Sequence, residues 1–198
     1  MGKYTMSGSI SGEKNRFLYV SWKDIYNACL KIFSEIEKEN IKIDCIVAIS
    51  RGGMIPAAIL ANCLDVRRVI VVNVKLYKEI GVKGRLEIER SLDLEKANIS
   101  TVLIVDDIVD TGETLEKVRE YIANYVWKIY TAAIFVKEWS KVKPDYYVYR
   151  TTRWVIFPWE IYEVVHKEGV KIDTLMKIGV PEEILKKVSE IVSRRENR

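Results

Sequence analysis

The sequence predicts an α/β protein with a central parallel sheet flanked by helices. Short apolar runs alternate with amphipathic helical segments in units of about 30 residues, as in strand–helix–strand repeats. The apolar runs contain few charges, which is typical of strands covered on both faces. The 198 residues are 48% hydrophobic and 30% charged, so the chain can bury a core beneath a charged surface. Sheets of this kind bind ligands at the carboxyl ends of their strands.

The amino half begins with an expected helix over Trp22–Glu39, where apolar residues recur every three or four positions: Ile25, Cys29, Ile32 and Ile36. The continuous apolar run Ile43–Ile49 then predicts a buried strand. Ser50–Gly53 interrupts this run with an arginine and two glycines. A second helix is expected over Met54–Leu64, because Pro56 is tolerated in the first turn of a helix.

The middle of the chain continues the alternation. Val66–Lys75 is rich in β-branched residues and predicts a strand. Residues 76–100 follow no single period, and we interpret them as a mobile excursion with one or two short strands, which we call the hood. The remaining predictions here are a buried strand over Thr101–Asp106, a helix over Glu113–Asn124 and a buried strand over Ile129–Val136.

The last third is more irregular. Tyr146–Arg150 alternates like an edge strand, and Trp154–Pro158 is expected to form an aromatic loop before a helix. Ile172–Ile178 and Pro181–Arg195 are predicted to be charged, peripheral helices. The expected organisation is therefore a lead segment, one main domain that includes the hood, and a small helical C-terminal extension, over residues 1–20, 21–165 and 166–198.

Composition excludes several classes of protein. Lys and Arg total 32 against 28 Asp and Glu, and the resulting net charge of +4 is too small to indicate a nucleic acid partner. No apolar run is long enough to span a membrane, so no membrane partner is expected. The three cysteines form no CxxC pair and indicate reduced thiols in a cytoplasmic protein. The complete absence of glutamine suggests a thermophilic source.

One segment contains most of the candidate ligand-binding residues. The strand ends in Asp106 and Asp107, and a short turn before the next helix then supplies Asp110, Thr111, Gly112 and Thr114. Free N–H groups at a helix amino end bind phosphate monoesters, and a glycine lets the backbone approach a ligand closely. Adjacent carboxylates can hold sugar hydroxyls or a hydrated Mg²⁺ ion. A phosphate site beside a diol site predicts a sugar phosphate ligand.

These residues resemble the phosphoribosyl pyrophosphate (PRPP) signature of the type I phosphoribosyltransferases, in which two acids at a strand end precede D-T-G-x-T. The resemblance implies that Asp106 and Asp107 contact the ribose hydroxyls, directly or through Mg²⁺. It implies that Asp110 is a general base or hydrogen-bond acceptor for a purine N7 proton. It also assigns the 5′-phosphate to Thr111, Gly112, the backbone of Glu113, and Thr114. We expect the Glu113 carboxylate to face solvent, away from that phosphate.

A second set of residues matches the family's pyrophosphate site. Arg51 and Gly52 lie where the family has a loop that contacts pyrophosphate, and the resemblance implies a strained, cis peptide there. Arg51 offers a fixed fork of donors to anionic oxygens, so it is a catalytic candidate for stabilising the leaving group. Lys75 ends the second strand and is also expected to bind PRPP. The hood would close over PRPP, with candidate cations at Lys78, Lys83 and Arg85.

The base site is implied by a lysine and an aromatic segment. The pattern of Lys137 followed by Trp154, Val155 and Ile156 resembles the 6-oxopurine branch, especially the bacterial xanthine–guanine enzymes. The resemblance implies that Lys137 bonds the 6-oxo group, that Trp154 stacks on the ring, and that the Val155 carbonyl accepts from the ring edge. A lysine donor selects an oxo group over an amino group, which disfavours adenine.

The expected function is purine salvage. The chain would transfer the 5-phosphoribosyl group from PRPP to hypoxanthine, guanine or xanthine, with Mg²⁺ as cofactor, and family members are usually homo-oligomers, dimers or tetramers. One alternative is a phosphoribosyltransferase for adenine, orotate or uracil. Another is a PRPP-sensing transcription regulator on the same fold. Arg51 and Lys137 together favour catalysis over sensing.

Overall fold

The computed structural model describes residues 16–77, 85–88 and 99–196. Within this part of the chain two compact units can be distinguished. Unit 1 spans Tyr26–Thr152, and unit 2 combines residues 16–25 with residues 153–196. The division predicted from sequence, at residues 20 and 165, stays a prediction. No helix in the described ranges has the length and apolar character that a bilayer crossing requires.

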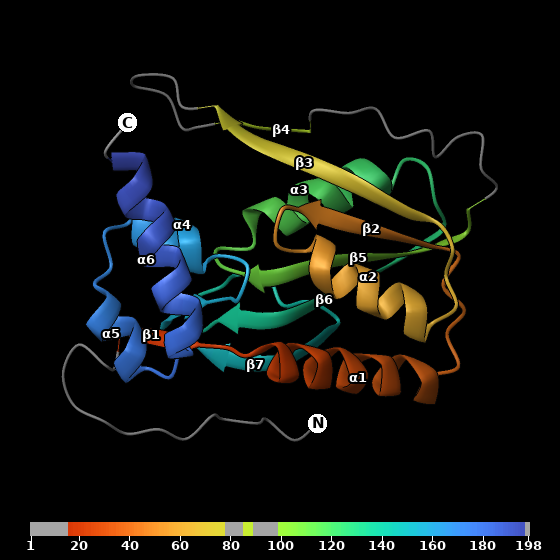
Figure 1. Cartoon of the computed structure of the whole chain (residues 1–198). Coiled ribbons are helices and arrows are strands. Elements are labelled where there is room, and N and C mark those ends of the chain that lie inside the picture. Colours follow the sequence, from red (N-terminus) through yellow and green to blue (C-terminus); the bar gives the residue numbers. More distant parts are fainter. Residues whose placement is uncertain (1–15, 78–84, 89–98, 197–198) are drawn as a thin grey trace. The chain divides into compact units, whose positions relative to one another are not determined.

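Unit 1 is built on a six-stranded sheet with the order β4-β3-β2-β5-β6-β7 (Figure 1). Five of its strands run parallel, and β4 pairs antiparallel with β3. This arrangement confirms the predicted fold class and the short strand expected within the hood. The strands are β2 (Cys45–Ser50), β3 (Val69–Tyr77), β4 (Arg85–Ile88), β5 (Thr101–Val109), β6 (Lys128–Lys137) and β7 (Tyr146–Thr151).

Different helices cover the two faces of this sheet. α1 (Trp22–Lys38), which belongs to unit 1 from Tyr26 onward, and α2 (Met54–Cys63) lie on one face (Figure 1). α3 (Glu113–Ile122) lies on the other. All three helices begin at the predicted residue and end within two residues of the predicted end, because their signals are local: a periodic apolar stripe or a glycine break before the first turn.

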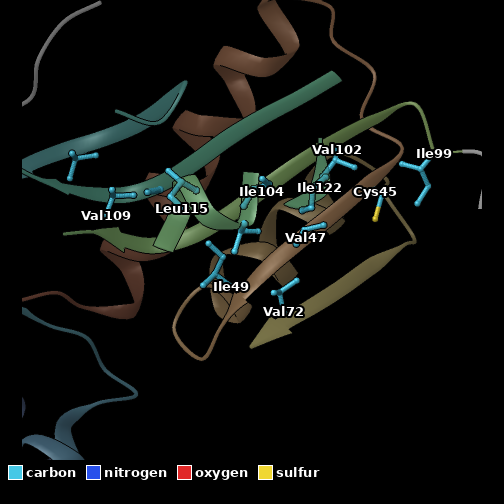
Figure 2. Packing of buried hydrophobic residues seen from close by; sticks show 13 residues of the cluster. Cys45, Val47, Ile49, Val72, Ile99, Val102, Ile104, Val109, Leu115 and Ile122 are labelled. Carbon is cyan, nitrogen blue, oxygen red and sulfur yellow. The ribbon is translucent and has the colours of Figure 1, made fainter. Parts of the chain in front are cut away.

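The main core fills the space between the sheet and α3 (Figure 2). Side chains alternate along a strand, so every second residue of β2 faces this helix: Cys45, Val47 and Ile49. They pack in one buried cluster with residues of α3 and β5, among them Leu115, Val118, Ile122, Val102 and Ile104. The core therefore fixes the position of the strand ends, where the predicted ligand residues lie.

The strand β5 is longer than expected. The sequence predicts that it ends at Asp106, but it continues to Val109. The extension is paired with β6 through Asp106↔Ala133 and Val109↔Val136. Val109 is buried in the core cluster, so the backbone stays extended through the acidic pair to bring this side chain inward.

Unit 2 corrects one further prediction and confirms another. Residues Trp154–Ile156 form a strand, β8, which pairs parallel with β1 (Phe17–Tyr19), although this stretch was expected to be a loop. The two predicted C-terminal helices are present as α5 (Ile172–Lys177) and α6 (Glu182–Glu196), and together with α4 (Ile161–His166) they share a core. Its buried residues are Phe17, Ile156, Ile161, Val164, Leu175, Val180, Leu185 and Val188.

The described residues include all three cysteines, and the two in α1 and β2 lie in the core. All three are free, and Cys29 and Cys45 are buried. Burial raises the pKa of Cys29 to about 12 and that of Cys45 to about 11. Both thiols therefore stay protonated at neutral pH, which makes them poor nucleophiles and poor metal ligands.

Candidate functional site

The predicted ligand residues of unit 1 gather at one edge of the sheet. β2, β5 and β6 are parallel neighbours, so their carboxyl ends meet there. The register pairs Ala48 with Val105 and Val109 with Val136. The turn after β2, the acidic residues of β5 and Lys137 at the end of β6 consequently lie along the same edge, as expected for a ligand site in an open α/β sheet.

Asp106 and Asp107 form a closely coupled acidic pair. Asp107 is only 6% exposed, and its N–H donates to Oδ1 of Asp106 at 2.9 Å. The Ile108 N–H donates to Oδ1 of Asp107 at 2.8 Å. Burial, and then the charge of Asp107, raise the pKa of Asp106 well above its ordinary value, and burial also raises the pKa of Asp107. Full ionisation of this pair is therefore unfavourable unless a cation or hydroxyl donors join it.

The turn after β2 lies directly against this pair. The Ser50–Arg51 peptide is cis, as the resemblance implied. A Cβ on Gly52 would overlap the carboxyl group of Asp107, and a Cβ on Gly53 would lie 2.5 Å from the Val105 carbonyl oxygen. Glycine at both positions thus allows the Arg51–Gly53 backbone to approach β5. Arg51 itself is exposed at the start of this turn.

The Asp110–Thr114 turn leads into α3. Gly112 precedes the helix with a φ of 93°, a left-handed conformation that favours glycine. A Cβ here would also lie 2.5 Å from Cβ of Val142. The Thr111 carbonyl accepts a hydrogen bond from the Lys141 N–H at 3.3 Å. Glu113 is exposed, which agrees with the expectation that its carboxylate faces solvent.

Lys137 and Asp110 are connected through a residue that sequence analysis did not select. Trp139 donates its Nε1–H to Oδ1 of Asp110 at 2.7 Å. The ammonium nitrogen of Lys137 lies 5.0 Å from the centroid of the Trp139 ring. Burial lowers the pKa of Lys137, whereas the charge of Asp110 acts in the opposite direction. The only signal in the sequence was a tryptophan two positions after the candidate lysine.

Other predicted residues belong to unit 2 or have side chains outside the described residues. Trp154, Val155 and Ile156 belong to unit 2, where Val155 and Ile156 are buried and Trp154 is exposed, its ring centroid 5.9 Å from that of Phe17. Their assembly with Lys137 into one base site stays a prediction. The backbone of Lys75 is part of β3, but its side chain lies outside the described residues, as do Lys78 and Lys83 of the hood.

The unit 1 site thus has the parts needed to bind a phosphorylated sugar: a glycine turn, an acidic pair and a helix amino end. Comparison with known proteins is consistent with this class. A sequence model of the phosphoribosyl transferase domain matches residues 19–165. The chain therefore belongs to the phosphoribosyltransferase family and is a transferase.

The relatives that match this chain include enzymes named for purine bases. A xanthine-guanine phosphoribosyltransferase from Ruegeria sp. is 37% identical over 123 residues, covering 59% of this chain and 68% of the relative. One from Desulfotalea psychrophila is 29% identical over 76% of this chain and 91% of its own length. Among solved structures, a purine phosphoribosyltransferase from Pyrococcus horikoshii is 35% identical, with a TM-score of 0.66 over 73% of this chain and 94% of its own.

Proposed function

We propose that this chain transfers the 5-phosphoribosyl group from PRPP to a 6-oxopurine base, with release of pyrophosphate. The main observation behind the proposal is that a buried lysine, Lys137, and a carboxylate, Asp110, both contact the indole of Trp139. They lie at the sheet edge that also holds the acidic pair. A lysine donor and a carboxylate acceptor match the oxo group and the protonated ring nitrogen of a 6-oxopurine. Several relatives bear the name xanthine-guanine phosphoribosyltransferase.

The sugar phosphate would be held by hydrogen-bond acceptors at the ribose and by hydrogen-bond donors at the phosphate. Asp106 and Asp107 accept hydrogen bonds from the ribose 2′- and 3′-hydroxyls. The backbone N–H groups of residues 111–114, together with the hydroxyls of Thr111 and Thr114, bind the 5′-phosphate. The first N–H groups of a helix have no acceptor within the helix, so they can donate to a phosphate. The Glu113 N–H, which donates to Thr111 Oγ1 at 3.3 Å, would exchange this bond for one to the phosphate.

The acidic pair also fits a magnesium ion. Mg²⁺ prefers carboxylate and phosphate oxygens and is often held by one or two carboxylates together with substrate phosphates. Asp106 and Asp107 would hold the ion, directly or through water, and its charge would favour their ionised forms. When bound with PRPP, Mg²⁺ supplies charge neutralisation for the pyrophosphate.

The reaction exchanges one bond at ribose C1 for another. A purine ring nitrogen forms a bond to C1 as the bond from C1 to the pyrophosphate oxygen breaks, and both electrons of that bond leave with pyrophosphate. Arg51 and Lys75 stabilise the departing anion. Lys137 donates to the 6-oxo group, and Asp110 accepts the N7 proton that the ring gives up. Trp154, with the adjoining Val155 and Ile156, would contribute the stacking surface and the backbone acceptor.

One panel of assays tests the function. Pyrophosphate release is measured with PRPP, Mg²⁺ and each of hypoxanthine, guanine, xanthine, adenine, orotate and uracil. Release with the 6-oxopurines alone supports the proposal, and release with another base would assign the chain to that base instead. DNA binding that falls steeply with salt, without pyrophosphate release, would favour the PRPP-sensing regulator.

Self-association, a cytoplasmic location and a thermophilic source also belong to the proposal. α2 has no charged residue, and its exposed Met54 lies on a helix whose residues, apart from Asn62, are apolar. An uncharged face can meet its own copy across a two-fold axis without like-charge repulsion. Light scattering should show an oligomer for the wild type and a monomer for Ala58→Glu. A melting temperature in the mesophilic range would contradict the thermophilic source.

A further inference from the structure

Trp139 stands out because it contacts two functional candidates while being half exposed itself. It follows the carboxyl end of β6 and is 53% exposed, so burial in the core does not account for its position. Its indole Nε1–H donates to Oδ1 of Asp110, and its ring faces the ammonium group of Lys137. The indole has a single donor and no acceptor, so this hydrogen bond uses its whole polar capacity.

The backbone around Trp139 is fixed to the Asp110 turn independently of the indole. The Ser140 N–H donates to the Lys137 carbonyl at 3.0 Å, which closes a tight turn after β6. The Lys141 N–H donates to the Thr111 carbonyl at 3.3 Å. The first bond closes the turn and the second joins it to the Asp110 loop, so the indole side chain is presented to Asp110 by a defined backbone.

The two contacts have different physical consequences. Asp110 is an exposed carboxylate that would otherwise rotate, and a donor on Oδ1 restricts that rotation while Oδ2 stays available to a ligand. Lys137 is 9% exposed, and a cation over an aromatic face is attracted by the electron density of the ring. One rigid side chain with two rotatable bonds therefore sets the separation between an acceptor and a donor.

That separation matters for a 6-oxopurine, whose 6-oxo oxygen and N7 lie next to each other on one edge of the ring. A ligand of this shape needs an acceptor for N7–H and a donor for the oxygen at a fixed spacing. We propose that Trp139 is a positioning residue for the purine site, holding Asp110 by its indole N–H and Lys137 by its ring face. This inference rests on the proposed function and adds a residue that determines how the base is oriented.

Two substitutions separate the contacts. Trp139→Phe keeps an aromatic ring beneath Lys137 but removes the N–H donor to Asp110. We expect kcat to fall about tenfold, with the KM values for base and PRPP unchanged. Trp139→Leu removes both contacts, so the KM for the base should also rise about threefold, while the KM for PRPP stays constant.

The chain offers a matched control. Trp127, 93% exposed, immediately precedes β6, at the opposite end of that strand from Trp139. Trp127→Phe should leave kcat and both KM values at the wild-type level. An unchanged kcat in Trp139→Phe overturns the proposal. So does a loss that affects PRPP and base equally and is accompanied by a lower melting temperature, because that pattern indicates a purely structural role.

A spectroscopic measurement tests the contact without any assay of transfer. In ¹⁵N-labelled protein, the Trp139 indole N–H signal is assigned as the one missing from Trp139→Phe. It should shift and exchange faster with solvent in Asp110→Ala, while the Trp127 signal stays in place. A Trp139 signal that ignores Asp110→Ala overturns the inference. If the wild type transfers to no base, the proposed function fails, and this measurement still decides whether Trp139 holds Asp110.

Discussion

Replacing Gly52 by alanine should destabilise the protein through one identifiable collision. The added Cβ would meet all three atoms of the Asp107 carboxyl group, and the farthest of them, Oδ1, would be only 2.6 Å away. Ordinary van der Waals contacts of a Cβ begin near 3.4 Å. Asp107 cannot move aside freely, because it is buried and its Oδ1 accepts the Ile108 N–H at 2.8 Å.

The magnitude follows from the two ways in which the collision can be relieved. Either the turn shifts, which in an overpacked site costs about 1–3 kcal/mol, or Asp107 gives up its hydrogen bond, which costs about 1.5–3 kcal/mol for a charged acceptor. We therefore expect Gly52→Ala to lower the free energy of unfolding by about 2 kcal/mol, equivalent to about 5 °C in melting temperature. PRPP binding should weaken as well, because one relief route displaces the Arg51–Gly53 turn and the other displaces the Asp107 carboxylate, and both groups are proposed to bind PRPP.

A double-mutant cycle measured by urea denaturation identifies the cause. In an Asp107→Ala background the collision is gone, so Gly52→Ala should cost less than about 0.5 kcal/mol. The adjacent Gly53→Ala is the control, since its Cβ would meet backbone atoms, the carbonyl oxygens of Val105 and Ile49, which Asp107→Ala cannot remove. Its cost should be the same in both backgrounds. If the cost of Gly52→Ala is also equal in both, the reasoning is refuted.

Three other predictions concern the acidic pair, the base site and the C-terminal core. Folding raises the pKa of Asp106, so above about pH 4 the folded state binds more protons than the unfolded state. The free energy of unfolding of the ligand-free protein should therefore fall as pH rises from about 4, until Asp106 is ionised in both states. Asp106→Asn should reduce this fall in denaturation experiments from pH 4 to 9, and an unchanged slope would contradict the assignment. Lys137→Ala should lower kcat/KM for the base about 10–100-fold with PRPP affinity retained, whereas Asp110→Ala should lower kcat about 100-fold or more, and an equal loss of PRPP affinity would place the base site elsewhere. Leu185 is 1% exposed, and Leu185→Ala should lower the free energy of unfolding, measured by calorimetry, by about 2–5 kcal/mol. Ile191 is 47% exposed, and Ile191→Ala should lower it by less than about 1 kcal/mol. An equally small loss for both variants would mean that Leu185 is not part of a core.

Local signals explain why most of unit 1 could be predicted from the sequence. α1 carries an apolar stripe with helical spacing, and β2 is a continuous apolar run, so each is recognisable without its neighbours. The Asp106–Asp107 pair and the Gly112 turn were found for the same reason, since strand end, turn and helix start are consecutive. The raised pKa values of the pair could not be predicted, because they depend on burial by the Gly52 turn from another strand.

Non-local pairing explains the errors. β1 and β8 are three residues each, too short to show an alternating period, and each is a strand because the other is present. The charge of α6 suggested a solvated helix, but Leu185 and Val188 point into a core formed with elements elsewhere in the chain. Trp139 was missed because its role depends on the register that brings the end of β6 beside the Asp110 turn.

The pairing of Phe17 with Trp154 also has a consequence for the order in which the protein is made. A ribosome releases the β1 segment early, yet its partner strand emerges only after the whole of the parallel sheet has been synthesised. Until then the apolar side chain of Phe17 has no strand to join, and it stays exposed to chaperones and to neighbouring nascent chains. Vectorial synthesis therefore makes the sheet of unit 1 before the strand that carries Trp154. A chain that stalls between the two would hold the sugar phosphate residues without the aromatic residue proposed to stack on the base.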